Sequence, residues 1–188
     1  MAEFINYARG AERFVNMADF FLGITLPEDF TEEVESLRRR FAAPRTRPHI
    51  TLIPPFKWSG SDQDLETVIH DSLQGCSPFK MTCKGLGRFG RAVIFIDVVA
   101  SPELMALYSK LKEGLSQEGI GDRGKDRPYH PHITLATRLS SGEFHQYVEE
   151  LGDYLPIRDF LCREVALFKM QTQGRFRRWQ VAKKVELG

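Results

Sequence analysis

A pentapeptide, Pro-His-Ile-Thr-Leu, stands at residues 48–52 of the chain and is repeated letter for letter at residues 131–135. Corresponding positions of the two copies lie 83 residues apart. In a chain of this composition, a second identical copy has a chance expectation of about one in ten thousand. Two copies at so long a spacing do not fit a solenoid, so the repeat indicates two related halves of one fold.

Each copy of the pentapeptide is expected to form a β-strand with a polar face. Successive side chains of a strand point to opposite sides, so His49 and Thr51 share one face of the first copy. His132 and Thr134 share the corresponding face of the second copy, and the aliphatic residues lie on the other side. If a pseudo-two-fold axis relates the halves, the two polar faces converge on one cleft that holds two imidazoles and two hydroxyls.

The remaining sequence predicts short strands mixed with helices in one domain, residues 20–188, preceded by a helical extension over residues 1–19. Pro54 and Pro55 are expected to end the strand that begins at His49. The expected strands cover residues 20–26, 49–53, 79–88, 91–99, 132–137, 162–171 and 176–187. The expected helices cover residues 28–41, 62–73, 102–115 and 141–154.

Composition excludes several classes of protein. Hydrophobic residues make up 42% and charged residues 27% of the 188 residues, which is ordinary globular usage and rules out disorder or collagen. No apolar run approaches the ~20 residues of a membrane span, so no membrane partner is expected. The three cysteines, Cys76, Cys83 and Cys162, form no C-x-x-C pair and indicate reduced residues of a cytoplasmic protein. We expect a soluble monomer.

The expected cleft holds the groups that hydrolysis of a phosphodiester needs in the absence of a metal. Displacement at phosphorus requires a base that takes a proton from water and an acid that protonates the leaving oxygen. An imidazole, with an ordinary pKa of about 6.5, can fill either role near neutral pH. His49 and His132 are therefore the candidate acid and base. The hydroxyls of Thr51 and Thr134 are the candidate donors to the non-bridging oxygens.

The segments around the repeat resemble a known family. Residues 47–56 read Arg-Pro-His-Ile-Thr-Leu-Ile-Pro-Pro-Phe, and residues 127–136 read Arg-Pro-Tyr-His-Pro-His-Ile-Thr-Leu-Ala. The paired His-Ile-Thr-Leu segments resemble the H-x-T-x motifs of the 2H phosphoesterase superfamily. Their surroundings look most like its 2′-5′ RNA ligase / RNA 2′,3′-cyclic phosphodiesterase branch. The order of expected elements supports the resemblance from about Phe20 to Leu187, and the first 19 residues fall outside it.

This resemblance implies an α+β fold of two lobes, a pseudo-two-fold arrangement of two antiparallel sheets flanked by helices, with a central cleft. It also implies opening of a 2′,3′-cyclic phosphate to a 2′-phosphate without a cofactor, with RNA as the expected partner. Carried over by motif, His49 would protonate the leaving 3′ oxygen, His132 would activate water, and Thr51 and Thr134 would hold the phosphate. Because the motifs are identical and the reverse reaction, in relatives a 2′-5′ ligation, exchanges the roles, the division between acid and base stays open.

Residues beside the motifs are candidates for substrate binding. Phe56 and Tyr129 could stack on a base, although aromatic residues beside strands more often belong to the core. Arg47, Arg127 and Arg138 bracket the motifs and could bind an anion locally in a chain whose net charge is only +1. A late basic cluster consists of Arg175, Arg177 and Arg178. That cluster fits either contact with an RNA tail or a charged strand edge that resists aggregation.

Three alternatives stay open at this level. The same chemistry could act on a small cyclic nucleotide, an ADP-ribose cyclic phosphate or a cyclic oligonucleotide, which the lack of a global basic charge mildly favours. The chain could also be an RNA-binding module that binds phosphate without catalysis. A zinc site built from His49, His130 and His132 is a third possibility, although no carboxylate or further ligand stands at a suitable local spacing.

Overall fold

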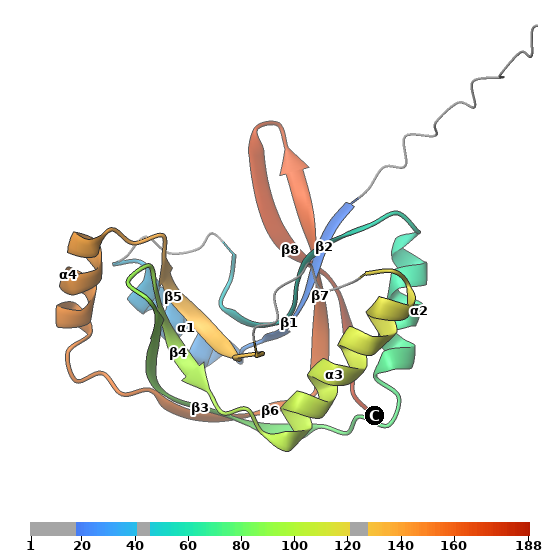
Figure 1. The fold of residues 1–188 in the computed structure, drawn as a ribbon, viewed down its shortest axis with the longest axis horizontal. Helices are drawn as coiled ribbons and strands as arrows, with labels where there is room; N and C mark the ends of the chain where they lie inside the picture. Colours follow the sequence, from blue (N-terminus) through green and yellow to red (C-terminus); the bar gives the residue numbers. More distant parts are fainter. Residues whose placement is uncertain (1–17, 41–45, 121–127) are drawn as a thin grey trace, which may run out of the picture.

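The structure, a computed structural model, describes residues 18–40, 46–120 and 128–188 (Figure 1). Within these residues the chain forms a mixed α+β fold of eight strands and four helices. The strands are β1 (Ala18–Thr25), β2 (His49–Trp58), β3 (Phe79–Phe89), β4 (Val93–Val98), β5 (His132–Thr137), β6 (Ile157–Cys162), β7 (Glu164–Gln173) and β8 (Phe176–Glu186). The helices are α1 (Glu28–Arg38), α2 (Asp62–Ser72), α3 (Pro102–Gln117) and α4 (Ser141–Leu151).

The strands form two antiparallel halves that meet at the two motif strands. Their order is β6-β3-β4-β5-β2-β1-β7-β8, so β5 and β2 lie side by side in the middle. Outward from this line, each motif strand pairs with the strand that precedes it in the chain, β1 beside β2 and β4 beside β5. The expected antiparallel α+β arrangement is therefore confirmed, although the strands form one eight-stranded sheet whose halves are joined through one registered pair, Ile50 with Ile133.

The helices that lead into the motif strands pack across the halves. Helix α1 follows β1, yet the ring of its Phe30 lies 6.4 Å from that of Phe160 in β6, and its Glu33 accepts a hydrogen bond from Arg158 in β6. Helix α3 follows β4, yet it packs against α2 and contacts β2. In Figure 1, α1 and α4 accordingly lie on one side of the molecule and α2 and α3 on the other. Because α1 and α3 each pack against the opposite half of the sheet, they hold the two halves together.

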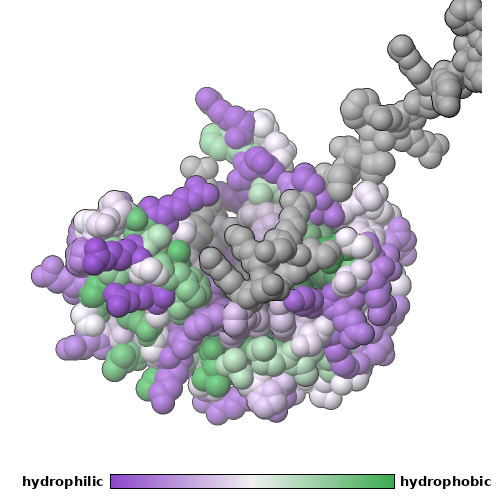
Figure 2. All heavy atoms as spheres, viewed as in Figure 1, coloured by the Kyte–Doolittle hydropathy of each residue, from purple (hydrophilic) through white to green (hydrophobic). Residues whose placement is uncertain are grey.

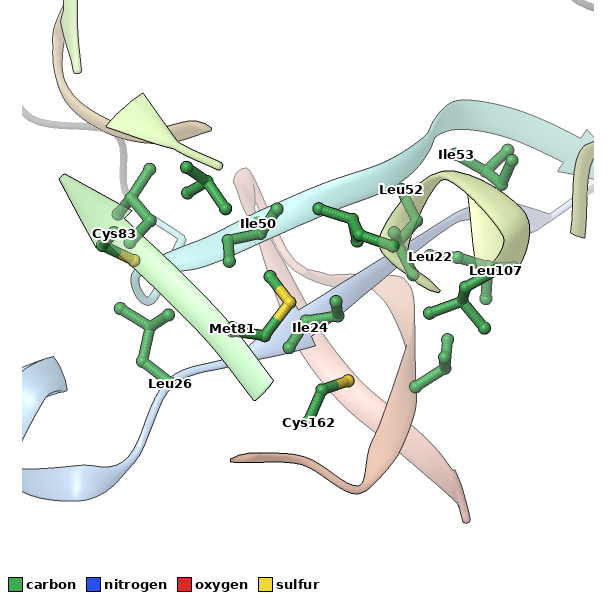
Figure 3. Packing of buried hydrophobic residues seen from close by; sticks show 14 of the residues in the cluster. Leu22, Ile24, Leu26, Ile50, Leu52, Ile53, Met81, Cys83, Leu107 and Cys162 are labelled. Carbon is green, nitrogen blue, oxygen red and sulfur yellow. The ribbon is translucent and has the colours of Figure 1, made fainter. Parts of the chain in front are cut away.

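Alternation along the motif strands places their aliphatic residues in the core. Ile50, Leu52, Ile133 and Leu135 are fully buried, and Figure 3 shows Ile50 and Leu52 among the packed side chains. Helix α3 adds a buried stripe at helical spacing that consists of Leu104, Leu107, Leu111 and Leu115. Full burial of one such side chain contributes about 1.5–3 kcal/mol, so the core determines which face of each motif strand is left for the histidines.

The structure corrects the expected end of the first motif strand. Strand β2 does not end at Pro54-Pro55 but continues to Trp58. The prolines lie at a register shift, between the pairs Leu22–Ile53 and Phe20–Phe56, in a part of β2 that pairs with β1 on one side. Residues without an N–H are accommodated at such an irregular edge because no ladder hydrogen bond is lost there.

Other predicted boundaries shift by a few residues. The edge strand β6 was not predicted, and the strand expected from residue 162 begins at Glu164. The helix expected to reach residue 41 ends at Arg38, and the helix expected to reach residue 154 ends at Leu151, before the positive φ of Gly152. Residues 1–17 of the predicted helical extension lie outside the described residues, and residues 18–19 begin β1.

The surface in the view of Figure 2 is mixed, with hydrophilic residues prevailing beside α2 and at the tip of the β7–β8 hairpin. This hairpin projects beyond the rest of the sheet (Figure 1). In the described part of the chain, none of the helices combines the length and the apolar character needed to cross a membrane.

Candidate active site

The two motifs meet on one face of the sheet, where β2 borders β5. The registered pair between these strands is antiparallel, so the same register places His49 opposite Thr134 and Thr51 opposite His132. All four side chains lie on the face opposite the core, and each is half-buried. Diagonal neighbours across such a pair lie about 7–8 Å apart. The register therefore makes the two histidines diagonal neighbours on one face of the sheet.

The backbone holds each motif histidine in the same way. Nδ1 of His49 lies 2.7 Å from the carbonyl oxygen of Arg47, and Nδ1 of His132 lies 2.8 Å from that of His130. A carbonyl oxygen can only accept, so each Nδ1 carries the hydrogen and donates it. In the neutral ring Nε2 is then the basic nitrogen, and among the described residues neither Nε2 has a hydrogen-bond partner. Both rings are thus ready to exchange a proton with a ligand.

Phenylalanine rings support both imidazoles. The ring of His49 lies 4.8 Å from that of Phe21 and 5.3 Å from that of Phe168. On the other half, the ring of His132 lies 5.0 Å from Phe89 and 5.0 Å from Phe95. None of these four phenylalanines was predicted from the sequence. Phe21 and Phe95 lie in β1 and β4, which are apolar on both faces here, so alternation does not show which of their rings lie beside the histidines.

Two glycines allow the close approach of these rings to the backbone. A Cβ atom at Gly87 would lie 2.2 Å from Cε2 of Phe95, so a larger residue there would force the ring of Phe95 to move. A Cβ atom at Gly23 would lie 2.8 Å from the carbonyl oxygen of Ile50 and 3.5 Å from Cδ2 of His49. Glycine at these two positions therefore allows the rings of Phe95 and His49 to pack close to the neighbouring strand backbone.

Burial lowers the pKa of both imidazoles. For His49 the main cause is desolvation, and the nearby charges of Arg38 and His132 lower it further, to about 4. For His132 desolvation again lowers the pKa, and the backbone hydrogen bond to His130 opposes the decrease. The charge of His130 lowers this pKa further, and the carboxylate of Asp97 raises it to a smaller extent. The electrostatic influence of His132 on His49 agrees with their placement across the same cleft. Burial thus favours the neutral form of both rings in the free protein.

The two halves differ in the charges that surround their histidines. Asp97 pairs across the sheet with His132, and its Oδ1 atom lies 2.9 Å from Nε2 of His130. The corresponding position in the first half, opposite the other histidine, is the uncharged Thr25. That half instead has the buried Arg38, which is 5% exposed and donates from Nη1 to a backbone carbonyl 2.9 Å away. The charge that faces His49 from Arg38 thus disfavours a proton on that ring, whereas His132 has a carboxylate, Asp97, that partly offsets the opposing charge of His130.

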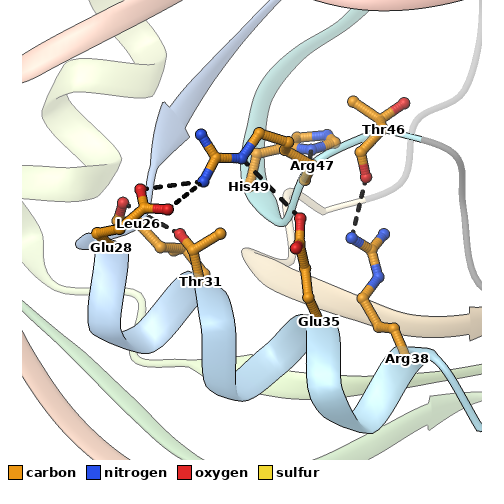
Figure 4. A network of polar contacts seen from close by, with 8 residues as sticks. All are labelled: Leu26, Glu28, Thr31, Glu35, Arg38, Thr46, Arg47 and His49. Carbon is orange, nitrogen blue, oxygen red and sulfur yellow. Dashed lines mark hydrogen bonds and ion pairs between the residues drawn. The ribbon is translucent and has the colours of Figure 1, made fainter.

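Among the predicted substrate-binding residues, Arg47 lies next to the site but is engaged in ion pairs. Its Nη2 donates to both carboxylate oxygens of Glu28, at 2.7 and 3.0 Å, and its Nε lies 3.9 Å from Glu35 (Figure 4). The function of Arg47 that the structure shows is structural, because its carbonyl oxygen orients His49 and its side chain ties β2 to α1.

The other two predicted arginines do not reach the histidines within the described structure. Arg138 is exposed beyond the end of β5, six residues from His132, which corresponds to about 20 Å along an extended strand. Arg127 lies outside the described residues.

The two predicted base-stacking residues have other surroundings. Phe56 is 7% exposed and packs in the core, with its ring 6.2 Å from Phe20, so the expectation that it stacks on a base is wrong. Tyr129 stacks on Tyr108, with ring centroids 4.1 Å apart, and its hydroxyl donates to the carbonyl oxygen of Thr51. Burial raises the pKa of Tyr129, which keeps this donor protonated. Tyr129 thus fastens the second motif to the first.

The histidine cluster of the zinc alternative does not assemble. Nε2 of His130 faces Asp97, and Nδ1 of His132 faces a backbone carbonyl. Over the residues that the structure describes, no group of three or more His, Cys, Asp or Glu side chains is arranged to hold a metal ion.

Two histidine–threonine pairs at the junction of two antiparallel sheets place the protein among the 2H phosphoesterases. A sequence model of the 2′-5′ RNA ligase superfamily matches residues 26–174, and the chain belongs to that superfamily. Among curated proteins, one from Staphylococcus aureus strain Newman named “Putative phosphoesterase” is 28% identical over 132 residues, covering 65% of this chain and 74% of that protein.

Solved structures share the fold. Escherichia coli LigT complexed with 3′-AMP matches with a TM-score of 0.65 and 21% identity, over 92% of this chain and 99% of LigT. The protein TT0787 of Thermus thermophilus matches with a TM-score of 0.65 and 19% identity, over 90% and 97% of the two chains. At these identities the likeness establishes the fold, and it confirms the α+β arrangement expected from the sequence.

The burial of His49 predicts that acid destabilises the fold. Its pKa falls from 6.5 to about 4 in the folded chain, so the unfolded state binds this proton first. Stability is therefore complete above about pH 6.5 and is lost as the pH falls toward 4, by about 2 kcal/mol between pH 7 and pH 5. Urea unfolding at both pH values measures the loss, which should be smaller by about that amount in His49→Gln. An equal loss in both proteins would contradict the burial.

Proposed function

We propose that this protein hydrolyses the 2′,3′-cyclic phosphate at an RNA end to a 2′-phosphate by acid–base catalysis with two histidines and no metal. The observation that carries the proposal is the diagonal placement of His49 and His132, each with Nδ1 bound to a backbone carbonyl and Nε2 free. Thr51 and Thr134 stand beside them. The solved complex of LigT with 3′-AMP supports a nucleotide as the ligand of this fold.

The proposed reaction is an in-line displacement at phosphorus. One Nε2 takes a proton from water as the water oxygen bonds to phosphorus, and the bond from phosphorus to the 3′ oxygen breaks. The other imidazole, protonated at the start, donates its Nε2 proton to the departing 3′ oxygen. The threonine hydroxyls donate hydrogen bonds to the non-bridging oxygens. The products are a 2′-phosphate and a 3′-hydroxyl, and a 5′-hydroxyl in place of water would form a 2′-5′ linkage.

The surroundings of the two rings favour one division of the roles. The motif resemblance assigns the acid to His49 and the base to His132. In the free protein, however, His49 has a pKa of about 4 and lies near Arg38, whereas the carboxylate of Asp97 partly offsets the lowering of the pKa of His132 by burial and by His130. An acid must hold its proton before the reaction, so we propose His132 as the acid and His49 as the base.

The proposal is tested with an RNA oligonucleotide that ends in a 2′,3′-cyclic phosphate, incubated with the protein in excess EDTA. The expected product is the 2′-phosphate, which ³¹P NMR distinguishes from the 3′-phosphate. The double variant His49→Ala, His132→Ala is the control for contaminating nucleases. A 3′-phosphate product, equal hydrolysis by the double variant, or loss of hydrolysis in EDTA that zinc restores would each contradict the proposed chemistry.

A further inference from the structure

A cavity of about 460 Å³ lies beside His49 at the outer end of the first half. Its lining includes Arg47 and Pro48, which directly precede His49. It also includes Phe168, whose ring lies 5.3 Å from that of His49. The volume falls within the range of about 300–1,000 Å³ that is usual for small-ligand sites. The cavity therefore adjoins the histidine face through Phe168 and through the two residues that precede His49.

Trp179 of β8 forms an aromatic wall of the cavity. Its ring meets Phe21 edge-on, with centroids 4.9 Å apart, and Phe21 stacks on Phe168 with centroids 4.2 Å apart. These contacts hold the indole in place, while its N–H has no hydrogen-bond partner among the described residues. A fixed, partly exposed indole is a stacking surface for a nucleobase, since every base has a π-face.

One of the basic side chains that line the cavity has no acidic partner among the described residues. Three basic side chains line it, namely Arg47, Arg178 and Lys184. Arg47 pairs with Glu28 at the start of α1, as Figure 4 shows, and Lys184 pairs with Glu164. Arg178 makes no ion pair or hydrogen bond through its side chain with any other residue that the structure describes. A free guanidinium in a polar and aromatic cavity suits a phosphate group.

We propose that this cavity binds the base and the 5′-phosphate of the nucleotide whose 2′,3′-cyclic phosphate lies between the histidines. Trp179 stacks on the base, and Arg178 binds the 5′-phosphate. The inference rests on the proposed function and narrows its substrate class, because a 5′-phosphate is present at the end of an RNA chain and absent from a nucleoside 2′,3′-cyclic phosphate. The cavity thereby selects polynucleotide ends over small cyclic nucleosides.

The kinetic test compares adenosine 2′,3′-cyclic phosphate with its 5′-phosphorylated form. We expect kcat/KM to be about tenfold or more higher for the 5′-phosphorylated substrate, as one charge-assisted contact provides. Arg178→Gln should reduce this preference to within about twofold. Arg175→Gln is the matched control, because it removes the same charge from the same hairpin outside the cavity, and it should keep the preference.

A binding test keeps this inference separate from turnover. Calorimetry compares adenosine 2′,5′-bisphosphate with adenosine 2′-monophosphate, and we expect the bisphosphate to bind about tenfold more tightly. Arg178→Gln should abolish this difference in affinity, and Trp179→Leu should weaken the binding of both ligands. Equal affinities in the wild type, or a preference that survives Arg178→Gln, would overturn the subsite even if cyclic phosphates are hydrolysed. A preference in binding without hydrolysis of any cyclic phosphate would support the subsite and overturn the proposed function.

Discussion

Replacement of either motif histidine by alanine is expected to lower kcat for hydrolysis of a 2′,3′-cyclic phosphate by about 10²–10⁴-fold. In the proposed mechanism, His49 and His132 supply the proton acceptor and the proton donor of a single displacement, so the loss of one leaves the other without its partner step. The double variant should lose little more than either single variant, since groups that act as a unit are not additive. Release of the 2′-phosphate at saturating substrate and pH 7 measures the effect.

The threonines provide a graded control for this experiment. Thr51→Ala and Thr134→Ala each remove one hydrogen bond to a non-bridging oxygen and should reduce kcat less, by about tenfold or somewhat more. Thr51→Ser and Thr134→Ser retain the hydroxyl and should retain most of the activity. Because all four side chains lie on the face opposite the core, urea unfolding at pH 7 should show folded proteins throughout. Full activity of His132→Ala would overturn the mechanism.

The face that carries the histidines and threonines could be predicted because it depends on a local property of the chain. Alternation within a strand relates His49 to Thr51 and separates both from the buried Ile50, whatever the rest of the fold does. The repeat then implies a second such face in a related half. Only their meeting, through the pair Ile50–Ile133, required tertiary structure, and the pseudo-two-fold expectation anticipated it correctly.

The surroundings of the histidines could not be predicted, because they depend on segments far apart in the chain. Phe21 and Phe168 reach His49 from β1 and β7, and the apolar sequence of these strands does not distinguish a core ring from a cleft ring. Conversely, closeness to a motif in the sequence does not place a residue at the site. Phe56 follows the first motif by only a few residues, yet the register of β2 turns it into the core.

The electrostatic difference between the halves is likewise a tertiary property. Asp97 stands 35 residues before His132 in the sequence and carries no motif of its own. It comes to lie beside that ring because β4 pairs with β5 in a register that sets the two residues opposite each other. Two identical motifs can therefore have different proton affinities, and identity in sequence gives no guide to which ring is the acid.

A substrate whose leaving group needs no proton is expected to separate the two histidines. When sulfur replaces the 3′ oxygen of the cyclic phosphate, the thiolate departs unprotonated, because a thiol has a pKa far below that of an alcohol. The variant that lacks the general acid should then recover most of the 10²–10⁴-fold loss, on the order of the whole contribution of that group. The variant that lacks the general base should stay inactive, since water must still lose its proton.

From the placement of Asp97 and Arg38 we expect recovery in His132→Ala and none in His49→Ala. A thiol reagent follows the released 3′-thiol directly, and the oxygen substrate provides the matched control for each protein. Recovery in His49→Ala alone would assign the acid to His49 and the base to His132, as the motif resemblance implies. It would mean that the bound phosphate, rather than the charges of Asp97 and Arg38, determines which ring is protonated. Recovery in neither variant would show that the rings do not divide the proton transfers, and the paired-histidine mechanism would then have to be abandoned.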